Sequence, residues 1–487
     1  MTKRFFMILA CSFLLIFGWF PSTQASDASD DLENGAALVV ELMDLMHEYH
    51  LNNPEAAVLT EGAIQGLLDS LEDPYADYFS DAELKGFTDL LNGDLVGVGI
   101  EVTPGEEYPL VLNVIPGTPA EKSGIKTGDI IMAVDGQSIS GWSLDEAVSK
   151  IRGIAGTKVK LTLKRGKDVF EVSPIRADIH VPSVSQEMLP GKTGYIHLAA
   201  FSSTSSQEFD KALRSLSDAG MESLILDMRN NGGGYLDGAV EIMGNFVPEG
   251  TLAVSTVDGQ GHRDEFRTQK RTGADAVPMV VLVNEYSASA SELLAGALQD
   301  YEIATLVGDV TYGKGLVQTI LPLGSGGALK ITVAKYLTPA GHDIDQAGLT
   351  PDHYVLTGEL QKEVAWQILH PEDVPDLTLE LGTGRAVLNG RVLKNTLAIE
   401  ERGNEYALPL RPTLEAMLYQ VLWQDGVIKV FSGRQEVWRN RPLVEQDSGR
   451  QDVFLHGGVS YLSENILKQL NIVIVKEENK ITLTRKK

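Results

Sequence analysis

The sequence is poor in cysteine and in basic residues. Its 487 residues include one cysteine, Cys11, which excludes an internal disulfide framework and a cysteine-based metal site. Only 41 lysines and arginines stand against 67 aspartates and glutamates, a net charge of −26. Nucleic acids and anionic membranes both bind basic surfaces, so this charge argues against both as partners.

Long apolar runs are also scarce, and the one present lies at the N-terminus. Lys3 and Arg4 precede an apolar run over residues 5–20, which small and polar residues up to Ala25 follow. This pattern predicts a secretory signal peptide over residues 1–26. The run is shorter than the roughly 20 residues of a spanning helix, which favours cleavage over a retained anchor. We therefore expect the protein to work outside the cytoplasm, secreted or held at the outer face of the membrane.

The remaining chain divides into four regions by pattern. Apolar residues at helical spacing predict a helical N-terminal region over 27–92. Short strands between glycine turns follow over 93–176, one of them from Ile130 to Val134. Strands alternate with helices over 177–366, which predicts an α/β core. Residues 367–487 predict a small α+β module, so the fold class is multidomain α/β and α+β.

Three serines alternate with alanine just before a helical apolar pattern. Ser287, Ser289 and Ser291 lie where a helix start would offer free backbone N–H groups. Further on, Lys314 stands between two glycines in a turn that joins two apolar runs. A lysine can act as the base for a serine only when neutral, which requires its pKa to fall from about 10.4 to roughly 7. Spacing alone leaves open a serine-rich helix start followed by an ordinary glycine turn.

The stretches SASASE, AGALQD and VGDVTYGKGLVQ resemble the active-site block of the carboxyl-terminal processing peptidases, serine proteases with a Ser–Lys dyad. The resemblance implies that Ser289 is the nucleophile, that Lys314 is its base and that Gln318 orients the lysine. It also implies a crotonase-like core and no metal or organic cofactor. Asp300, in the AGALQD stretch, is expected to be structural.

A glycine run follows another expected strand, Ser223 to Asp227. The sequence from Asp227 to Gly234, DMRNNGGG, resembles the DxRxNxGG block of the same peptidases. This resemblance implies an oxyanion hole formed by the backbone N–H of Ala290 and that of Gly232, Gly233 or Gly234, of which we favour Gly233. A phosphate-binding loop is the alternative, although the run lacks the Lys-Ser/Thr ending of such loops.

Residues 93–176 resemble a PDZ domain in its permuted bacterial order. Such a domain adds a peptide as a strand and holds its terminal carboxylate on backbone N–H groups, a role that suits the loop of Gly97, Val98, Gly99 and Ile100. Arg152 follows the second helix of this domain, and we consider it a candidate for coupling peptide occupancy to the protease. An ordinary surface arginine is the alternative.

The two ends of the chain carry further resemblances. LEDPYADYFSDAEL, which begins at Leu71, resembles the N-terminal region of these peptidases and implies a homodimer. The segment from Leu377 onward resembles the copper amine oxidase N-terminal-like module, without implying copper, and a wall-binding, envelope-partner or spacer role stays open. A faint repeat relates Leu410 to Leu462 and later apolar residues at an offset of 52.

These observations predict an extracytoplasmic serine endopeptidase that cleaves proteins near or from their C-termini. Its partners would be proteins or peptides with free C-termini. A non-catalytic PDZ scaffold of the cell envelope is the alternative from another class. An acyl-CoA enzyme is a second alternative, against which the PDZ-like region and the lack of a basic patch count.

Overall fold

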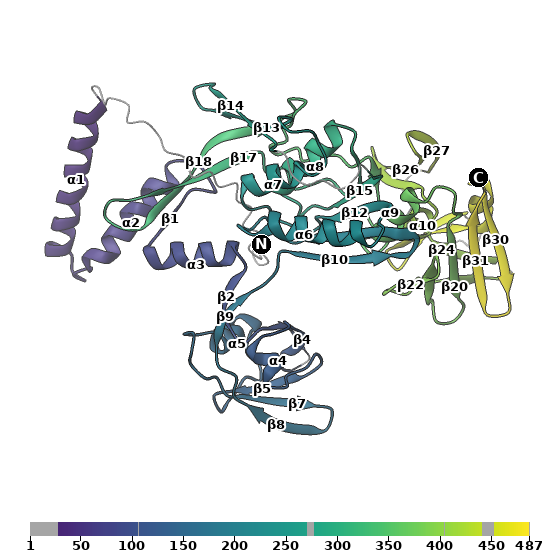
Figure 1. Cartoon of the computed structure of the whole chain (residues 1–487), viewed down its shortest axis with the longest axis horizontal. Coiled ribbons are helices and arrows are strands. Elements are labelled where there is room, and N and C mark those ends of the chain that lie inside the picture. The colour runs from purple at the N-terminus through teal and green to yellow at the C-terminus, as the bar shows by residue number, and fades with distance from the viewer. Residues whose placement is uncertain (1–27, 106, 270–276, 404, 441–451, 487) are drawn as a thin grey trace.

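A computed structural model describes residues 28–105, 107–269, 277–403, 405–440 and 452–486 (Figure 1). The expected signal peptide and Cys11 lie outside these residues. None of the helices in the described part of the chain is long and apolar enough to cross a membrane.

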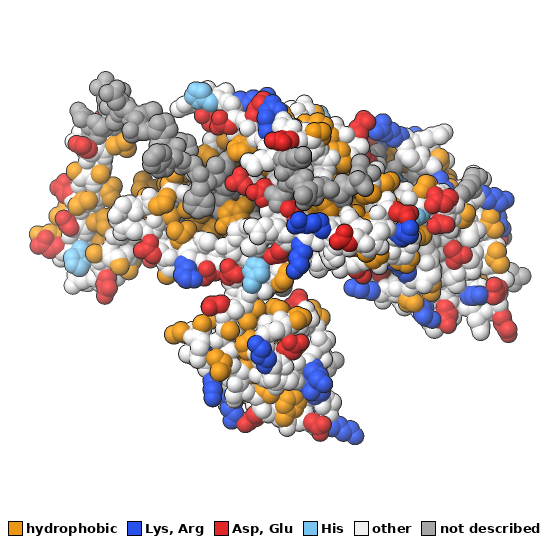
Figure 2. All heavy atoms as spheres, viewed as in Figure 1, with side chains coloured by type: hydrophobic (Ala, Val, Ile, Leu, Met, Phe, Trp, Pro, Cys, Tyr) orange, Lys and Arg blue, Asp and Glu red, His pale blue; other side chains and the backbone are white. Residues whose placement is uncertain are grey.

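The N-terminal region is helical, as its periodicity predicts, with one short strand. It comprises α1 (Ala28–Tyr49), α2 (Ala56–Asp69), β1 (Asp77–Phe79) and α3 (Asp81–Leu91). Helices α1 and α2 contact each other and project from the rest of the molecule (Figure 1). Their apolar residues are largely exposed, Leu38, Leu42 and Leu67 among them, and Figure 2 shows apolar side chains gathered over this end. An apolar surface of this kind marks a contact site.

The PDZ-like domain hangs below the body in Figure 1 and has its own core. Its sheet runs β3-β4-β5-β7-β8, with β6 paired to β5. The elements are β3 (Ile100–Thr103), β4 (Leu110–Val114), α4 (Pro119–Lys122), β5 (Ile130–Val134), β6 (Gln137–Ser138), α5 (Leu144–Ile151), β7 (Leu161–Arg165) and β8 (Asp168–Val172). The sequence thus predicted the bounds of β5 correctly.

A two-stranded neck joins this domain to the body. Strand β2 (Asp94–Gly97) pairs antiparallel with β9 (Ala177–His180). His180 at the end of β9 bridges two carboxylates, with Nδ1 2.9 Å from Asp94 in β2 and Nε2 3.0 Å from Glu208 in the body. These two carboxylates raise the pKa of His180. The neck is therefore joined to the body by contacts that depend on the protonation of His180.

The body is built on a six-stranded sheet in the order β10-β11-β12-β15-β16-β19. All neighbours pair in parallel except β10 with β11. The strands are β10 (Val184–Leu189), β11 (Thr193–Leu198), β12 (Ser223–Asp227), β15 (Met279–Val283), β16 (Ala304–Gly308) and β19 (His353–Tyr354); a 3-10 turn, Pro190–Lys192, separates the first two. Every residue of β12 and β15 is buried, which fits the apolar runs Leu224–Leu226 and Met279–Val283 within them.

Both faces of this sheet are covered. Helices α6 (Ser205–Asp218), α7 (Leu236–Met243) and α8 (Ala290–Asp300) share one apolar core with it. On the other face, α9 (Gln361–Leu369) and the C-terminal module share a second core with strands β12, β15 and β16. The expected helix and strand alternation of the α/β core is therefore present, while the crotonase likeness stays a prediction.

A second sheet of the body lies beside α8 and carries the glycine-lysine turn at one end. Its order is β1-β18-β13-β14, with β17 paired to β18. The strands are β13 (Leu252–Asp258), β14 (Arg263–Arg267), β17 (Leu316–Pro322) and β18 (Ala328–Leu337). Strand β1 joins this sheet from the N-terminal region, pairing Asp77 with Lys330 and Phe79 with Ala328.

The C-terminal module contains two similar units, each a strand, a helix and a hairpin. They are β24 (Glu405–Pro409), α10 (Leu410–Ala416), β25 (Gln420–Gln424) and β26 (Val427–Ser432), then β29 (Val459–Ser463), α11 (Glu464–Gln469), β30 (Ile472–Glu477) and β31 (Lys480–Arg485). The other strands are β20 (Asp376–Glu380), β21 (Ala386–Leu388), β22 (Arg391–Val392), β23 (Glu400–Arg402), β27 (Gln435–Asn440) and β28 (Val453–His456).

The constant offset of 52 holds only for the start of the first hairpin strands, Gln420 and Ile472; the second hairpin strands begin 53 residues apart and the helices 54 apart. Leu410 begins α10, whereas Leu462 still lies in β29. The module also packs directly on the six-stranded sheet of the body. Glu415 of α10 is fully buried, and its carboxylate accepts the backbone N–H groups of Leu356 at 2.9 Å and Thr357 at 3.0 Å. The module is therefore continuous with the body.

Candidate active site

Ser289 occupies a strained turn between a buried strand and a helix. Strand β15 ends at Val283 and α8 begins at Ala290, so Ser289 is the residue just before the helix. Its backbone has φ 59° and ψ −117°, which is rare for a residue other than glycine. Such strain persists only where the surroundings hold it, and it gathers at functional sites.

The three serines of the motif differ in what their hydroxyls contact. Ser287 donates to the carbonyl of Met228 and Ser291 to the carbonyl of Asn231, each at 2.8 Å. Both hydroxyls therefore tie the turn to the loop after β12. The Ser289 hydroxyl is buried and has no hydrogen-bond partner among the described residues. Of the three serines, Ser289 is the one whose hydroxyl does not hold the turn in place.

Glu292, in the first turn of α8, connects the serine turn to the lysine turn. One carboxylate oxygen accepts the backbone N–H groups of Ser289 at 2.8 Å and Lys314 at 2.9 Å. The other accepts the N–H of Gly313 at 2.7 Å and the hydroxyl of Thr311 at 2.5 Å. Because one oxygen binds both backbones, the serine and the lysine are neighbours. Burial raises the pKa of Glu292, and its four donors act against that rise.

Lys314 is almost completely buried, with 2% of its surface exposed. Its turn lies against residues 345–348, where a side chain on Gly315 would clash with Asp345. The Lys314 amine lies 4.3 Å from the centre of the Tyr75 ring, a residue of the N-terminal region. This distance is that of a cation–π contact.

Gln318 lies on β17, fully buried. Its Nε2 donates to the hydroxyl of Thr332 at 3.3 Å, while its Oε1 has no hydrogen-bond partner among the described residues. The structure therefore places Ser289, Lys314 and Gln318 in one buried region. In this conformation the amine of Lys314 is hydrogen-bonded neither to the Ser289 hydroxyl nor to the Gln318 oxygen.

Gly233 packs directly against the serine turn. A Cβ at this position would lie 2.8 Å from both the carbonyl oxygen of Ala288 and the Cβ of Ser289, and 3.1 Å from the nitrogen of Ala290. Its φ of +103° also favours glycine. The N–H of Gly233 donates to the side-chain oxygen of Asn231 at 2.9 Å, so here it is already occupied.

An ion pair holds the loop that carries Gly233. The Arg229 guanidinium binds both oxygens of Asp227 and reaches the carbonyl of Gly358 at 2.8 Å and the Gln361 side chain at 3.0 Å. Burial acts to raise the pKa of Asp227, but Arg229 outweighs it and holds that pKa below its usual value. The contacts of this pair are those of a structural ion pair.

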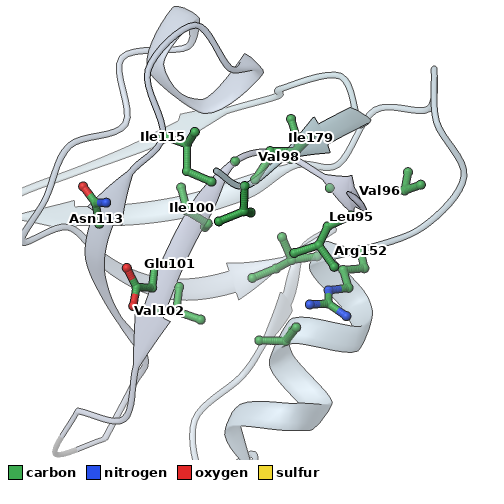
Figure 3. Close-up of a pocket in the computed structure, with 15 residues that line it drawn as sticks. Leu95, Val96, Val98, Ile100, Glu101, Val102, Asn113, Ile115, Arg152 and Ile179 are labelled. Carbon is green, nitrogen blue, oxygen red and sulfur yellow. The ribbon is translucent and has the colours of Figure 1, made fainter. Parts of the chain in front are cut away.

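A groove of about 430 Å³ runs along the PDZ-like domain (Figure 3). Gly97, Val98, Gly99 and Ile100 all line it, together with the neck residues Leu95 and Ile179. Arg152 also lines it and stands at the end of α5, beside Leu95 in Figure 3. The groove is predominantly apolar and touches both the domain and its neck.

Other polar candidates lie elsewhere. Asp300 accepts the backbone N–H of Ala340 at 2.8 Å and lies 3.3 Å from His342, a pair outside the serine turn. Within the described residues, one trio could hold a metal ion: His370, Glu372 and Asp373. The His370 ring already contacts Thr193 at 2.8 Å and stacks on Trp366, and both acids are exposed.

Sequence reasoning missed two residues of this site. Glu292 has a signal in the sequence, because a serine followed by glutamate three residues later is the pattern of a helix capping box. Tyr75 lies in a motif that the sequence did single out, but 239 residues before Lys314, and no local pattern reports a contact at that separation.

Three family models match successive parts of the chain. Residues 21–83 match the activating protease CtpB N-terminal domain, residues 91–164 the PDZ domain and residues 192–355 peptidase family S41. A probable CtpA-like serine protease of Staphylococcus epidermidis is 39% identical over 305 residues, covering 62% of each chain. One from Staphylococcus aureus strain N315 is 37% identical, covering 65% of this chain and 64% of the relative.

Among solved structures, a photosystem II D1 C-terminal processing protease is 33% identical, covering 66% of this chain and 87% of that one, with a TM-score of 0.42. The chain spans about 62% to 64% of the length of the curated relatives described above. The three family models end at residue 355, before the C-terminal module, whose resemblance stays a prediction. By its successive family matches and by its identity to the CtpA-like relatives, the chain belongs to the carboxyl-terminal processing peptidases of family S41 and carries a PDZ domain.

Proposed function

We propose that this chain is an extracytoplasmic serine endopeptidase that uses a Ser–Lys dyad to cleave proteins near or from their C-termini. The observation that carries the proposal is the difference in hydrogen bonding among the three serine hydroxyls. Two are engaged by the backbone, whereas the buried Ser289 hydroxyl, on a strained turn beside Lys314, has no hydrogen-bond partner among the described residues.

In the proposed reaction the Ser289 oxygen attacks the scissile carbonyl while neutral Lys314 takes its proton. The lysine then returns this proton to the leaving amine as the acyl-enzyme forms, and it activates the water that releases the product. Gln318 would hold the amine through its Oε1. The N–H groups of Gly233 and Ala290 would bind the oxyanion, which requires Gly233 to leave its bond to Asn231.

The PDZ domain would capture the C-terminus of a substrate in the apolar groove. Backbone N–H groups of the Gly97–Ile100 loop would hold the carboxylate, and Arg152 at the end of the groove would sense the bound peptide. Because the groove also touches the neck, peptide binding would act on the joint between domain and body.

The exposed apolar face of α1 and α2 supports a further part of the proposal, a homodimer formed through these helices. Light scattering of the native chain tests it. Loss of the dimer on replacing Leu38 and Leu42 with glutamate, at unchanged melting temperature, is the expected result. A native monomer at micromolar concentration refutes it.

Covalent labelling tests the dyad. A fluorophosphonate probe is expected to label the native chain and the Ser287→Ala control, and to fail with Ser289→Ala and Lys314→Met. Cleavage of dye-labelled casein should follow the same order. Labelling that survives in Ser289→Ala refutes the assignment of the nucleophile.

The non-catalytic scaffold is the second candidate, because in this conformation the Ser289 hydroxyl and the Gln318 oxygen do not bind the lysine. A scaffold would bind peptides with free C-termini in the groove, without labelling and without casein cleavage at any pH. Peptides with amidated C-termini serve as the control for groove binding in both cases.

A further inference from the structure

The segment Asp73–Phe79 brings the N-terminal region into contact with the proposed dyad. Its last three residues form β1 and pair with β18, which in turn pairs with β17, the strand that carries Gln318. Asp73 accepts the backbone N–H of Thr332 at 3.2 Å, and the hydroxyl of the same threonine accepts the amide of Gln318. The segment is therefore fixed to the strand pair behind the lysine.

Within this segment, Tyr75 lies on the lysine itself. The centre of its ring is 4.3 Å from the Lys314 amine. The face of an aromatic ring attracts a cation, so this contact stabilises the ammonium over the neutral amine. A lysine that accepts a proton from serine must be neutral. The contact therefore opposes the activity that we propose for Lys314.

Several charged and titratable groups contact the lysine turn, the serine turn or Tyr75. Glu292 binds the backbone of Lys314, and Asp345 binds the N–H of Gly315 at 3.3 Å. The Tyr336 hydroxyl donates to the carbonyl of Ser289 at 3.1 Å. Asp73 and Tyr312 lie beside Tyr75; burial, then Tyr312, raises the pKa of Tyr75 to about 12. The ring is thus a neutral phenol below pH 10.

We propose that Tyr75 is a positioning residue: its ring holds the Lys314 ammonium away from the Ser289 hydroxyl, so the N-terminal segment controls when the dyad forms. The inference rests on the proposed function of Ser289 and Lys314. The segment is continuous with α2, so a partner that covers the exposed face of α1 and α2 acts on the chain that carries Tyr75.

The test measures how fast a fluorophosphonate labels the chain between pH 5.5 and pH 10. In Tyr75→Leu the acid limb of this profile is expected to move to lower pH by about 0.5 to 1 unit, because the ring no longer favours the ammonium. Labelling below the midpoint then becomes about 3- to 10-fold faster. Tyr75→Phe keeps the ring and should keep the native midpoint.

Tyr78→Leu is the matched control, because Tyr78 is a second tyrosine of the same segment and the middle residue of β1. A purely structural effect would move both leucine variants alike. Tyr75→Met, whose flexible apolar side chain fills the space differently, replaces Tyr75→Leu if the latter melts at the assay temperature. A midpoint in the folded Tyr75 variant within about 0.2 unit of native refutes the role of Tyr75 alone.

Labelling of the native chain distinguishes failure of the Tyr75 proposal from failure of the proposed function. If it is not labelled at any pH, both the dyad and the role of Tyr75 are refuted. If it is labelled with a defined acid limb, only the comparison of the tyrosine variants decides.

Discussion

Replacing Glu292 with glutamine should disable the candidate site and destabilise the fold together. The carboxylate has no exposed surface, and each of its oxygens accepts two hydrogen bonds. An amide puts a donor in place of one oxygen. If the nitrogen faces Thr311 and Gly313, the threonine hydroxyl can rotate to accept, but the N–H of Gly313 is left facing another donor.

A buried donor without an acceptor costs about 1 to 3 kcal/mol. Loss of the charge also weakens the bonds that remain, by about 1 kcal/mol in total. We therefore expect Glu292→Gln to lower the free energy of unfolding by about 2 to 4 kcal/mol. The opposite amide orientation would strand the N–H groups of Ser289 and Lys314 and cost more.

Urea unfolding measures this change, and fluorophosphonate labelling in the absence of urea measures the site. Labelling should fall at least tenfold, because both backbones lose their common anchor and small displacements at a reacting centre are costly. The control is Glu146→Gln in α5, because Glu146 accepts the backbone N–H of Ser143 just before its helix as Glu292 accepts that of Ser289, but on the exposed surface. It should stay within about 0.5 kcal/mol of native. A Glu292→Gln chain less than 1 kcal/mol from native that labels at the native rate would refute the reasoning.

Three further predictions concern the loop, the neck and the module. Gly233→Ala should lower fluorophosphonate labelling about 100-fold because its Cβ meets fixed backbone, while Gly250→Ala, with φ +81° but open space, should label like native. Because the pKa of His180 is raised in the folded protein, the ion pairs of this residue stabilise the fold fully below about pH 6.5, and this stabilisation is lost as the pH rises through the folded pKa. The melting temperature should therefore fall less between pH 6 and pH 8.5 in His180→Asn than in the native chain. Equal falls would contradict the role of His180 in joining the neck to the body. Glu415→Gln should cost about 1 to 3 kcal/mol in urea unfolding, because a buried backbone N–H loses its acceptor, and a neutral result would contradict its role as an anchor.

The sequence was most informative where local pattern and burial coincide. Residues 223–227 and 130–134 form strands with the predicted bounds, because runs of apolar residues bounded by turn residues leave little freedom in where a buried strand ends. The serine turn was placed at the start of its helix for the same reason. The roles of Ser289, Lys314 and Gln318, however, came from resemblance and stay predictions.

Contacts between residues far apart in the chain could not be predicted from the sequence. The pairing of β1 with β18 joins residues more than 240 positions apart, and it is this pairing that delivers Tyr75 to the lysine. The bond from Gly233 to Asn231 was equally hidden, because a glycine run reveals which N–H groups can be exposed but not which of them a neighbouring side chain occupies.

The polar atoms of the site favour a change of conformation before the proposed dyad forms. A buried polar atom without a hydrogen bond costs about 1 to 3 kcal/mol, and the Ser289 hydroxyl and the Gln318 oxygen are two such atoms among the described residues. An amine that leaves the Tyr75 ring could bind both, since an ammonium carries three donors and a neutral amine still carries two and accepts one. The gain from these two bonds is comparable with the roughly 0.5 to 2 kcal/mol of a cation–π contact. Because these two free energies are so close, a bound peptide or a partner on the exposed face of α1 and α2 can shift the lysine from one position to the other.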